Sequence, residues 1–192
     1  MDRYYYHGIE AYSGATIETF KLINKILEEG LIARNKVLDL GSEFSHVCLY
    51  RKNEEFNYDD PERINVSARS GWIDNCFVFV ISPNISTYKA ENDSSKGKVE
   101  TNLVDEWRSV GDIKPDKFVG LGLPFGFIEE ELSSDIYSEE ERREMKKRFE
   151  KVVSDAKELG LFIVNSEEEN FTDRLDELLR KDAKHKNWKR GA

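Results

Sequence analysis

The chain has 192 residues, of which 39% are hydrophobic and 35% are charged, and its formal net charge is −9. This length fits one domain with a sizeable core. Eleven Phe, eight Tyr and three Trp argue against an intrinsically disordered chain, which would be poor in aromatic residues. The negative charge disfavours non-specific binding to DNA or to an anionic membrane.

The N-terminal segment predicts a strand followed by a helix. Residues 3–8 form a short strand that Gly8 ends. Thr16 caps a helix that runs to Glu29, because its apolar residues recur at helical spacing: Ile17, Phe20, Ile23, Ile26 and Leu27. Gly30 then stops this helix in a left-handed conformation.

Two strands and two loops are predicted in the middle of the chain. Residues 46–50 form a strand, and the polar residues 51–65, which contain a proline, form a loop. Residues 76–81 are continuously apolar, β-branched and aromatic, which is typical of a central strand buried on both faces. Residues 89–98 form the clearest flexible loop of the chain.

Two further strands follow this loop, one near residues 103–110 and one at residues 117–123, separated by a turn at Gly111-Asp112. The glycines of the run from Gly120 to Gly126 are interpreted as strand packing and a turn. Their spacing, G-x-G-x-x-x-G with no lysine after it, does not fit a phosphate-binding loop.

The C-terminal part predicts a helix, a strand and a last helix. Ser138 forms a capping box with Glu141, and Gly160 closes the helix, whose inward stripe is Met145, Phe149, Val152, Val153 and Ala156. Residues 161–164 form a strand, and a helix that begins near Thr172 buries Leu175, Leu178 and Leu179. We therefore expect one α+β domain over residues 1–180, with six or seven strands and three main helices, and a basic tail over residues 181–192.

Few residues offer metal or disulfide chemistry. Cys48 and Cys76 lie in apolar stretches and are expected to be buried small hydrophobes. Three scattered histidines and no C-x-x-C provide no metal-ligand spacing. The chain shows no signal peptide and no apolar run long enough to span a membrane, so we expect a cytoplasmic protein, with secretion by a signal-less route left open.

Two short constellations are candidates for a functional site. His7-Gly8 offers a neutral imidazole and a backbone that a ligand can approach closely. Glu106 lies between Asp105 and Trp107 on a predicted strand, where alternation points it away from both neighbours. Each has a plain alternative, a histidine that caps a strand end and a solvated edge glutamate.

The order of the segments gives these residues a context. His-Gly on the first strand is followed by "ILEEGL", "HVCLY", "FVFVIS", "DEWRSVGDIKPDKFVGLGLP" and "ELGLFIV". Over residues 3–165 this order resembles the ADP-ribosyltransferase superfamily, in its bacterial His-Gly…Glu form. The resemblance implies a split mixed or antiparallel β-sheet flanked by helices, and NAD as co-substrate.

The resemblance also implies a role for each matching residue. His7 would hydrogen-bond a ribose hydroxyl of NAD, and the backbone of Gly8 would hold the nicotinamide carboxamide. Glu106 would be the catalytic glutamate, whose carboxylate stabilises the oxocarbenium ion as nicotinamide leaves. Tyr50, or Tyr58 in its place, would stack on the nicotinamide. Arg69 is assigned to the pyrophosphate from its side-chain chemistry alone.

Departures from the family pattern disfavour some classes of acceptor. Val104 stands where arginine-modifying members carry a second glutamate, and no Ser-Thr-Ser follows the first strands. The acidic surface disfavours a nucleic-acid acceptor, although residues 180–192, which carry a charge of +5, leave one open. A solvated terminus is the plain reading of that tail.

The sequence therefore favours an NAD-dependent ADP-ribosyltransferase with an unknown protein or nucleic-acid acceptor. Three alternatives stay open: an inactive module of the same fold that binds a nucleotide or a partner, an RNA 2′-phosphotransferase-like enzyme, and an unrelated α+β interaction module.

Overall fold

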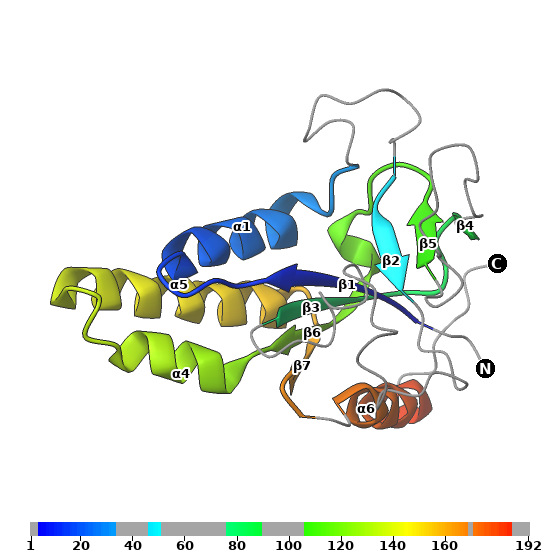
Figure 1. Ribbon diagram of the computed structural model, residues 1–192. Coiled ribbons are helices and arrows are strands. Elements are labelled where there is room, and N and C mark those ends of the chain that lie inside the picture. Colours follow the sequence, from blue (N-terminus) through cyan, green and yellow to red (C-terminus); the bar gives the residue numbers. More distant parts are fainter. Residues whose placement is uncertain (1–3, 34–45, 51–75, 90–105, 169–170, 186–192) are drawn as a thin grey trace, which may run out of the picture.

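A computed structural model of the chain describes residues 4–33, 46–50, 76–89, 106–168 and 171–185. Within these residues the fold is a mixed α+β arrangement around one seven-stranded sheet (Figure 1). The strands are β1 (Tyr5–Glu10), β2 (Cys48–Tyr50), β3 (Cys76–Ile81), β4 (Thr87–Lys89), β5 (Glu106–Ser109), β6 (Phe118–Leu123) and β7 (Phe162–Asn165). Their order across the sheet is β4-β5-β2-β1-β3-β6-β7. Neighbours are antiparallel except for the parallel pair β6 and β7.

Helices cover both faces of this sheet. They are α1 (Thr16–Glu29), α4 (Phe125–Ser133), α5 (Glu139–Glu158) and α6 (Phe171–His185), with a short 3-10 turn, η4 (Pro115–Lys117). One core cluster joins α1, α4 and α5 to the face of β3 that carries Phe77 and Phe79. A second cluster joins α6 to the opposite face, which carries Val78 and Val80. Figure 1 shows α1 and α6 on opposite sides of the sheet.

The prediction of a doubly buried strand at residues 76–81 is confirmed. All six residues of β3 are buried, and the strand pairs with β1 on one side and β6 on the other. Alternation sends Phe77 and Phe79 to one core cluster and Val78 and Val80 to the other. A strand covered on both faces has no polar side, which explains its continuous apolar run.

The predicted bounds of α1 are confirmed, but its expected cap is wrong. The helix runs from Thr16 to Glu29, and Gly30 ends it at φ +97°. The N-cap residue is Ala15, which provides no side-chain hydrogen bond. The hydroxyl of Thr16 instead donates to Glu131 on α4. The first residue of α1 is therefore anchored through its side chain to a carboxylate that is distant in sequence.

The capping box that was predicted for α5 is confirmed. The Ser138 side chain accepts from the Glu141 backbone N–H, and the Glu141 carboxylate accepts from the Ser138 backbone N–H. Of the predicted inward stripe, Met145, Val152 and Ala156 are fully buried, and the other two members, Phe149 and Val153, are partly buried.

Three predictions about local structure are corrected. Gly8 does not end the first strand, because β1 continues to Glu10 and Gly8 pairs with Val78 of β3. The sequence reasoning missed α4, which was taken for a turn, and the three-residue edge strand β4. The described residues therefore contain four α-helices, where three main helices were expected.

The glycines of β6 pack as the sequence analysis predicted. A Cβ on Gly120 would lie 2.9 Å from Cδ1 of Leu175 on α6, and one on Gly122 would lie 3.2 Å from the Val78 Cβ. Gly120 lets α6 approach the sheet closely, and Gly122 leaves room for Val78 and Ser166. Both glycines serve packing and are not part of a phosphate loop.

The sheet bends sharply beside β1. The hydroxyl of Tyr5 on β1 lies 2.6 Å from the Thr87 hydroxyl on β4, although two strands separate β1 from β4 in the sheet order. On a flat sheet these strands would be about 14 Å apart. Tyr5 also meets Trp107 of β5 edge-on, with ring centroids 5.9 Å apart. Figure 1 shows β2 and β5 running across the direction of β1 and β3.

Candidate functional site

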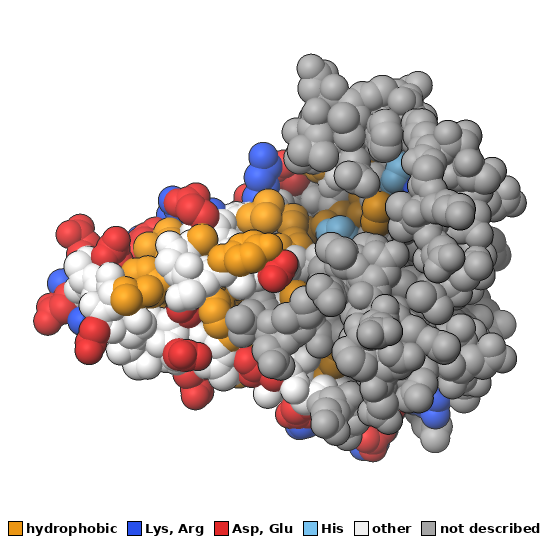
Figure 2. All heavy atoms as spheres, in the orientation of Figure 1, with side chains coloured by type: hydrophobic (Ala, Val, Ile, Leu, Met, Phe, Trp, Pro, Cys, Tyr) orange, Lys and Arg blue, Asp and Glu red, His pale blue; other side chains and the backbone are white. Residues whose placement is uncertain are grey.

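The bend leaves one edge of β1 open. β1 pairs with β3 along all six of its residues, but within the described residues it pairs with β2 only between Tyr6 and Tyr50. His7 and Gly8 follow directly after this single pair, and both are partly exposed. Figure 2 shows histidine atoms at the surface beside hydrophobic side chains. The predicted pair His7-Gly8 therefore lies at the seam where the two parts of the sheet separate.

The imidazole of His7 is fixed across this seam. Its Nδ1 lies 2.9 Å from the carbonyl oxygen of Cys48 on β2, so Nδ1 carries the proton and donates it. Burial lowers the pKa of His7 below its ordinary value, and the hydrogen bond to Cys48 only partly offsets this effect. The ring is therefore neutral at pH 7, and Nε2 is left as an acceptor. A ligand hydroxyl would therefore donate to Nε2.

Gly8 offers its backbone to the same opening. It pairs with Val78 on the β3 side, and within the described residues no strand pairs with it on the β2 side. Without a side chain, glycine allows close approach of a planar group to the backbone. The geometry is compatible with an amide that docks on β1.

Glu106 is placed by backbone pairing alone. It pairs with Tyr50 of β2, which in turn pairs with Tyr6 of β1, so the three form one cross-strand row. Two strand spacings, about 10 Å, separate the ends of such a row. His7 belongs to the next row along β1. His7 and Glu106 therefore lie in adjacent rows on β1 and β5, with β2 between the two strands.

The structure locates one of the three remaining predicted site residues. Tyr50 is placed by its pairing in β2, whereas Tyr58 and Arg69 lie outside the described residues. Of the two cysteines, Cys76 is buried, as expected, and Cys48 is partly exposed. The functional contribution of Cys48 is its carbonyl, which holds His7.

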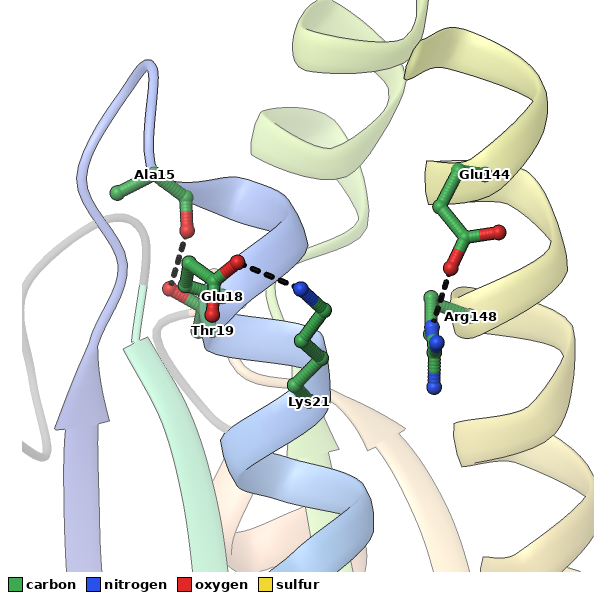
Figure 3. Close-up of polar contacts among 6 residues, drawn as sticks. All are labelled: Ala15, Glu18, Thr19, Lys21, Glu144 and Arg148. Atoms are coloured by element: carbon green, nitrogen blue, oxygen red, sulfur yellow. Dashed lines mark hydrogen bonds and ion pairs between the residues drawn. The ribbon is translucent and has the colours of Figure 1, made fainter. Parts of the chain in front are cut away.

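A groove among the described residues lies elsewhere. It encloses about 640 Å³ between the first turns of α1 and α5, and neither His7 nor Gly8 lines it. Charges along this groove are paired within their own helices (Figure 3). Lys21 contacts Glu18 at 2.7 Å on α1, and Glu144 contacts Arg148 at 2.6 Å on α5.

A buried carboxylate lies beneath this groove. Glu131 of α4 is only 3% exposed, and it accepts from Ser13 Oγ at 2.6 Å, Thr16 Oγ1 at 2.6 Å and the Gly14 N–H at 3.3 Å. The Tyr137 hydroxyl donates to the same carboxylate and accepts from the Gly14 N–H at 2.7 Å. Burial acts to raise the pKa of Glu131, but the hydrogen bonds outweigh it and lower the pKa.

The sequence analysis missed this network, although a signal was present. Phe127, Ile128 and Glu131 share the inner face of α4, where a glutamate is out of place. Recognising that face required α4 itself to be recognised. A second missed carboxylate, Glu167 after β7, accepts from the N–H groups of Gly126 and Phe127 and so caps α4.

Other classes of site find no support in the described residues. No group of three or more His, Cys, Asp or Glu side chains there is arranged to hold a metal ion. No helix among them is long and apolar enough to cross a membrane. The chain matches no protein-family model, no curated protein and no solved structure. The functional argument therefore depends on the chain's own residues.

Proposed function

We propose that this protein is an NAD-dependent ADP-ribosyltransferase that transfers ADP-ribose to a protein or nucleic-acid acceptor. NAD is the co-substrate, and the site is the seam between β1 and β2. His7 binds a ribose hydroxyl through Nε2, and Gly8 receives the nicotinamide carboxamide on its backbone. Glu106 on β5 stabilises the sugar cation as the bond to nicotinamide breaks.

The observation that carries this proposal is the fixed, neutral His7 at the open edge of β1. Its Nδ1 is held by the Cys48 carbonyl, so Nε2 has one defined direction and one defined role as acceptor. A histidine that merely caps a strand end would bond its own segment. This one instead bonds a second strand, at the point where the two strands stop pairing.

The chemistry requires an imidazole from β1 and a carboxylate from β5 to converge. Adjacent rows of a flat sheet point to opposite faces, and the Glu106 row contains Tyr6, the neighbour of His7. Convergence therefore needs the backbone of β5 to turn Glu106 toward the face of His7. The contact between Tyr5 and Thr87 shows that the sheet bends here toward the face of Tyr5 and His7, and this bend alone does not bring Glu106 to that face.

The test is release of nicotinamide from NAD, together with transfer of labelled ADP-ribose to cell extract. Glu106→Gln keeps the size of the side chain and removes its charge. We expect a loss of about 10²–10³-fold in turnover, the usual effect of removing one group that stabilises charge in a transition state. The matched control is Glu177→Gln, an exposed carboxylate on α6 that pairs with Lys181. Equal turnover by the two variants would contradict the assignment of Glu106.

A second candidate is a module of the same architecture that binds a nucleotide without turnover. The alternation of rows favours it, because His7 and Gly8 can hold a ligand even where no carboxylate reaches the sugar. Such a module would be stabilised by NAD, by about 2.7 kcal/mol at a hundredfold excess over Kd. It would release no nicotinamide, and Glu106→Gln would leave its thermal shift unchanged.

A further inference from the structure

The loop between β1 and α1, residues 11–15, is held from outside by one carboxylate. Glu131 on α4 accepts hydrogen bonds from Ser13, Gly14 and Thr16, and Tyr137 closes the network by bonding both Glu131 and Gly14. The bonds to Ser13 and Thr16 span 118 and 115 residues of sequence. The conformation of this loop is therefore fixed in part by α4 and Tyr137, which are distant in sequence.

Holding a loop in this way requires an ionised carboxylate to be buried, which carries a desolvation cost. All four donors to Glu131 are neutral, so no cation in the network offsets the cost of burying the carboxylate. A buried charge that is fully hydrogen-bonded adds little net stability, but it disfavours every conformation in which a bond is lost. The network is thus better suited to selecting one loop conformation than to stabilising the fold.

The loop begins where the open edge of β1 ends. Tyr12 is 61% exposed, and its hydroxyl donates to the Glu10 carboxylate at 2.7 Å, which lays it beside the end of the strand. Ala11, just before it, is buried, and Gly14 adopts φ +83°. An exposed aromatic residue is therefore held next to the strand that carries His7 and Gly8.

We propose that Glu131 is a positioning residue, which fixes the β1–α1 loop so that Tyr12 borders the nucleotide site at the end of the open edge of β1. This role rests on the proposed function, because the position of Tyr12 matters only if a nucleotide binds there. Glu131 itself touches no substrate. It acts through Ser13, Gly14 and Thr16, and the loop presents Tyr12.

A purely structural reading assigns Glu131 to anchoring the start of α1 through the Thr16 hydroxyl. The two readings predict different results. A structural anchor affects only the stability of the protein. A positioning residue also sets the fraction of molecules that can bind, and the apparent affinity falls in proportion to that fraction.

The experiment compares two variants of the Glu131 network with one control variant at the start of α4. Tyr137→Phe deletes the hydroxyl that bonds Glu131 and Gly14, and Thr16→Val is a second variant of the same network. Glu167→Ala removes the cap of α4, which is bonded to Gly126 and Phe127, and leaves the β1–α1 loop untouched. Each variant is measured for thermal stability, for the Kd of NAD by calorimetry, and for amide hydrogen exchange over residues 11–16 without ligand.

We expect Tyr137→Phe and Thr16→Val to speed exchange in residues 11–16 and to weaken NAD binding about three- to tenfold, the effect of one lost hydrogen bond. Glu167→Ala should speed exchange near residues 125–128 and leave the Kd unchanged. Unchanged exchange in residues 11–16 of both network variants would overturn the anchoring of the loop. Faster exchange with an unchanged Kd would overturn the positioning role alone. Wild-type protein that binds no NAD would overturn the proposed function and the positioning role, and the exchange result would still decide whether Glu131 anchors the loop.

Discussion

The strands on the two sides of the seam between β1 and β2 differ in length and in burial. β1, β3 and β6 are strands of six residues each, and the central one is fully buried. β2, β5 and β4 contain three or four residues each, and side-chain hydrogen bonds add to their ladders. One example is the buried Ser109, whose hydroxyl accepts from the Val47 N–H at 2.8 Å and donates to the Gly111 carbonyl at 2.6 Å.

This difference suggests separate roles, with the long strands stabilising the fold and the short strands carrying the proposed site. The long strands bury large apolar side chains on both faces, and such burial is the main favourable term in folding. The short strands carry the Cys48 carbonyl and the Glu106 backbone, which frame the proposed site. Segments with few buried apolar contacts open at low free energy, and binding regions are drawn from them. We therefore expect substitutions in the two parts to differ in both size and kind.

The largest effect is expected in β3. Phe79 is fully buried and packs against Phe118 with ring centroids 5.1 Å apart. Phe79→Ala should cost about 3–5 kcal/mol, the lost transfer energy plus the cavity. The control Tyr88→Ala changes a residue of β4 that is 45% exposed, and should cost less than about 1 kcal/mol. Urea unfolding measures both, and similar losses would refute the contrast between the two parts.

The next effect is expected where α1 meets the turn before β6. A Cβ on Gly30 would lie 2.2 Å from the Ile113 carbonyl oxygen, and the residue has φ +97°. Gly30→Ala should therefore cost clearly more than the ~1–2 kcal/mol of a left-handed alanine alone. Gly160→Ala isolates that strain, because Gly160 has φ +71° and no neighbour within 4 Å of the added Cβ. Equal losses of unfolding free energy would show that the Ile113 backbone moves away freely.

A smaller effect is expected at the contact between Ser109, at the end of β5, and Val47, just before β2. Ser109→Ala leaves the buried Val47 N–H without its acceptor, which should cost about 1–3 kcal/mol. Exchange of the Val47 amide should accelerate, while amides of β3 stay protected. If β3 opened together with Val47, the two parts of the sheet would be one cooperative unit and the comparison would fail.

Elements with local signals were predicted, and those with remote partners were not. The helical spacing of α1, the continuous apolar run of β3 and the capping box of α5 are each contained in their own residues. By contrast, α4 is capped by Glu167, about forty residues downstream. The three residues of β4 form a strand only because β5 offers them an edge.

The candidate site likewise contains residues that the sequence identified and a contact that it did not. The residue types His7 and Gly8 and the strand positions of Tyr50 and Glu106 were identified from motifs. The contact that orients His7 was not, because the Cys48 carbonyl is 41 residues away and any residue type provides a carbonyl. The sequence therefore named candidate groups, and only the fold assigned a proton to Nδ1 and an acceptor role to Nε2.

The smallest expected effect is a pH dependence of the unfolding free energy that arises from His7. Burial lowers the pKa of His7 below 6.5, so the unfolded chain binds more protons than the folded one in the window just below that value. The contribution of His7 to stability is therefore complete above pH 6.5 and declines as the pH falls through this window. His7→Gln keeps an amide donor for the Cys48 carbonyl and removes the titration.

The measurement is the difference in unfolding free energy between wild type and His7→Gln from pH 5 to 8. We expect this difference to be flat above pH 7 and to shift against the wild type on acidification. A shift in the opposite direction would mean that His7 is protonated in the folded protein. Both ring nitrogens would then be donors, and the acceptor at the open edge of β1, on which ribose binding depends, would not exist.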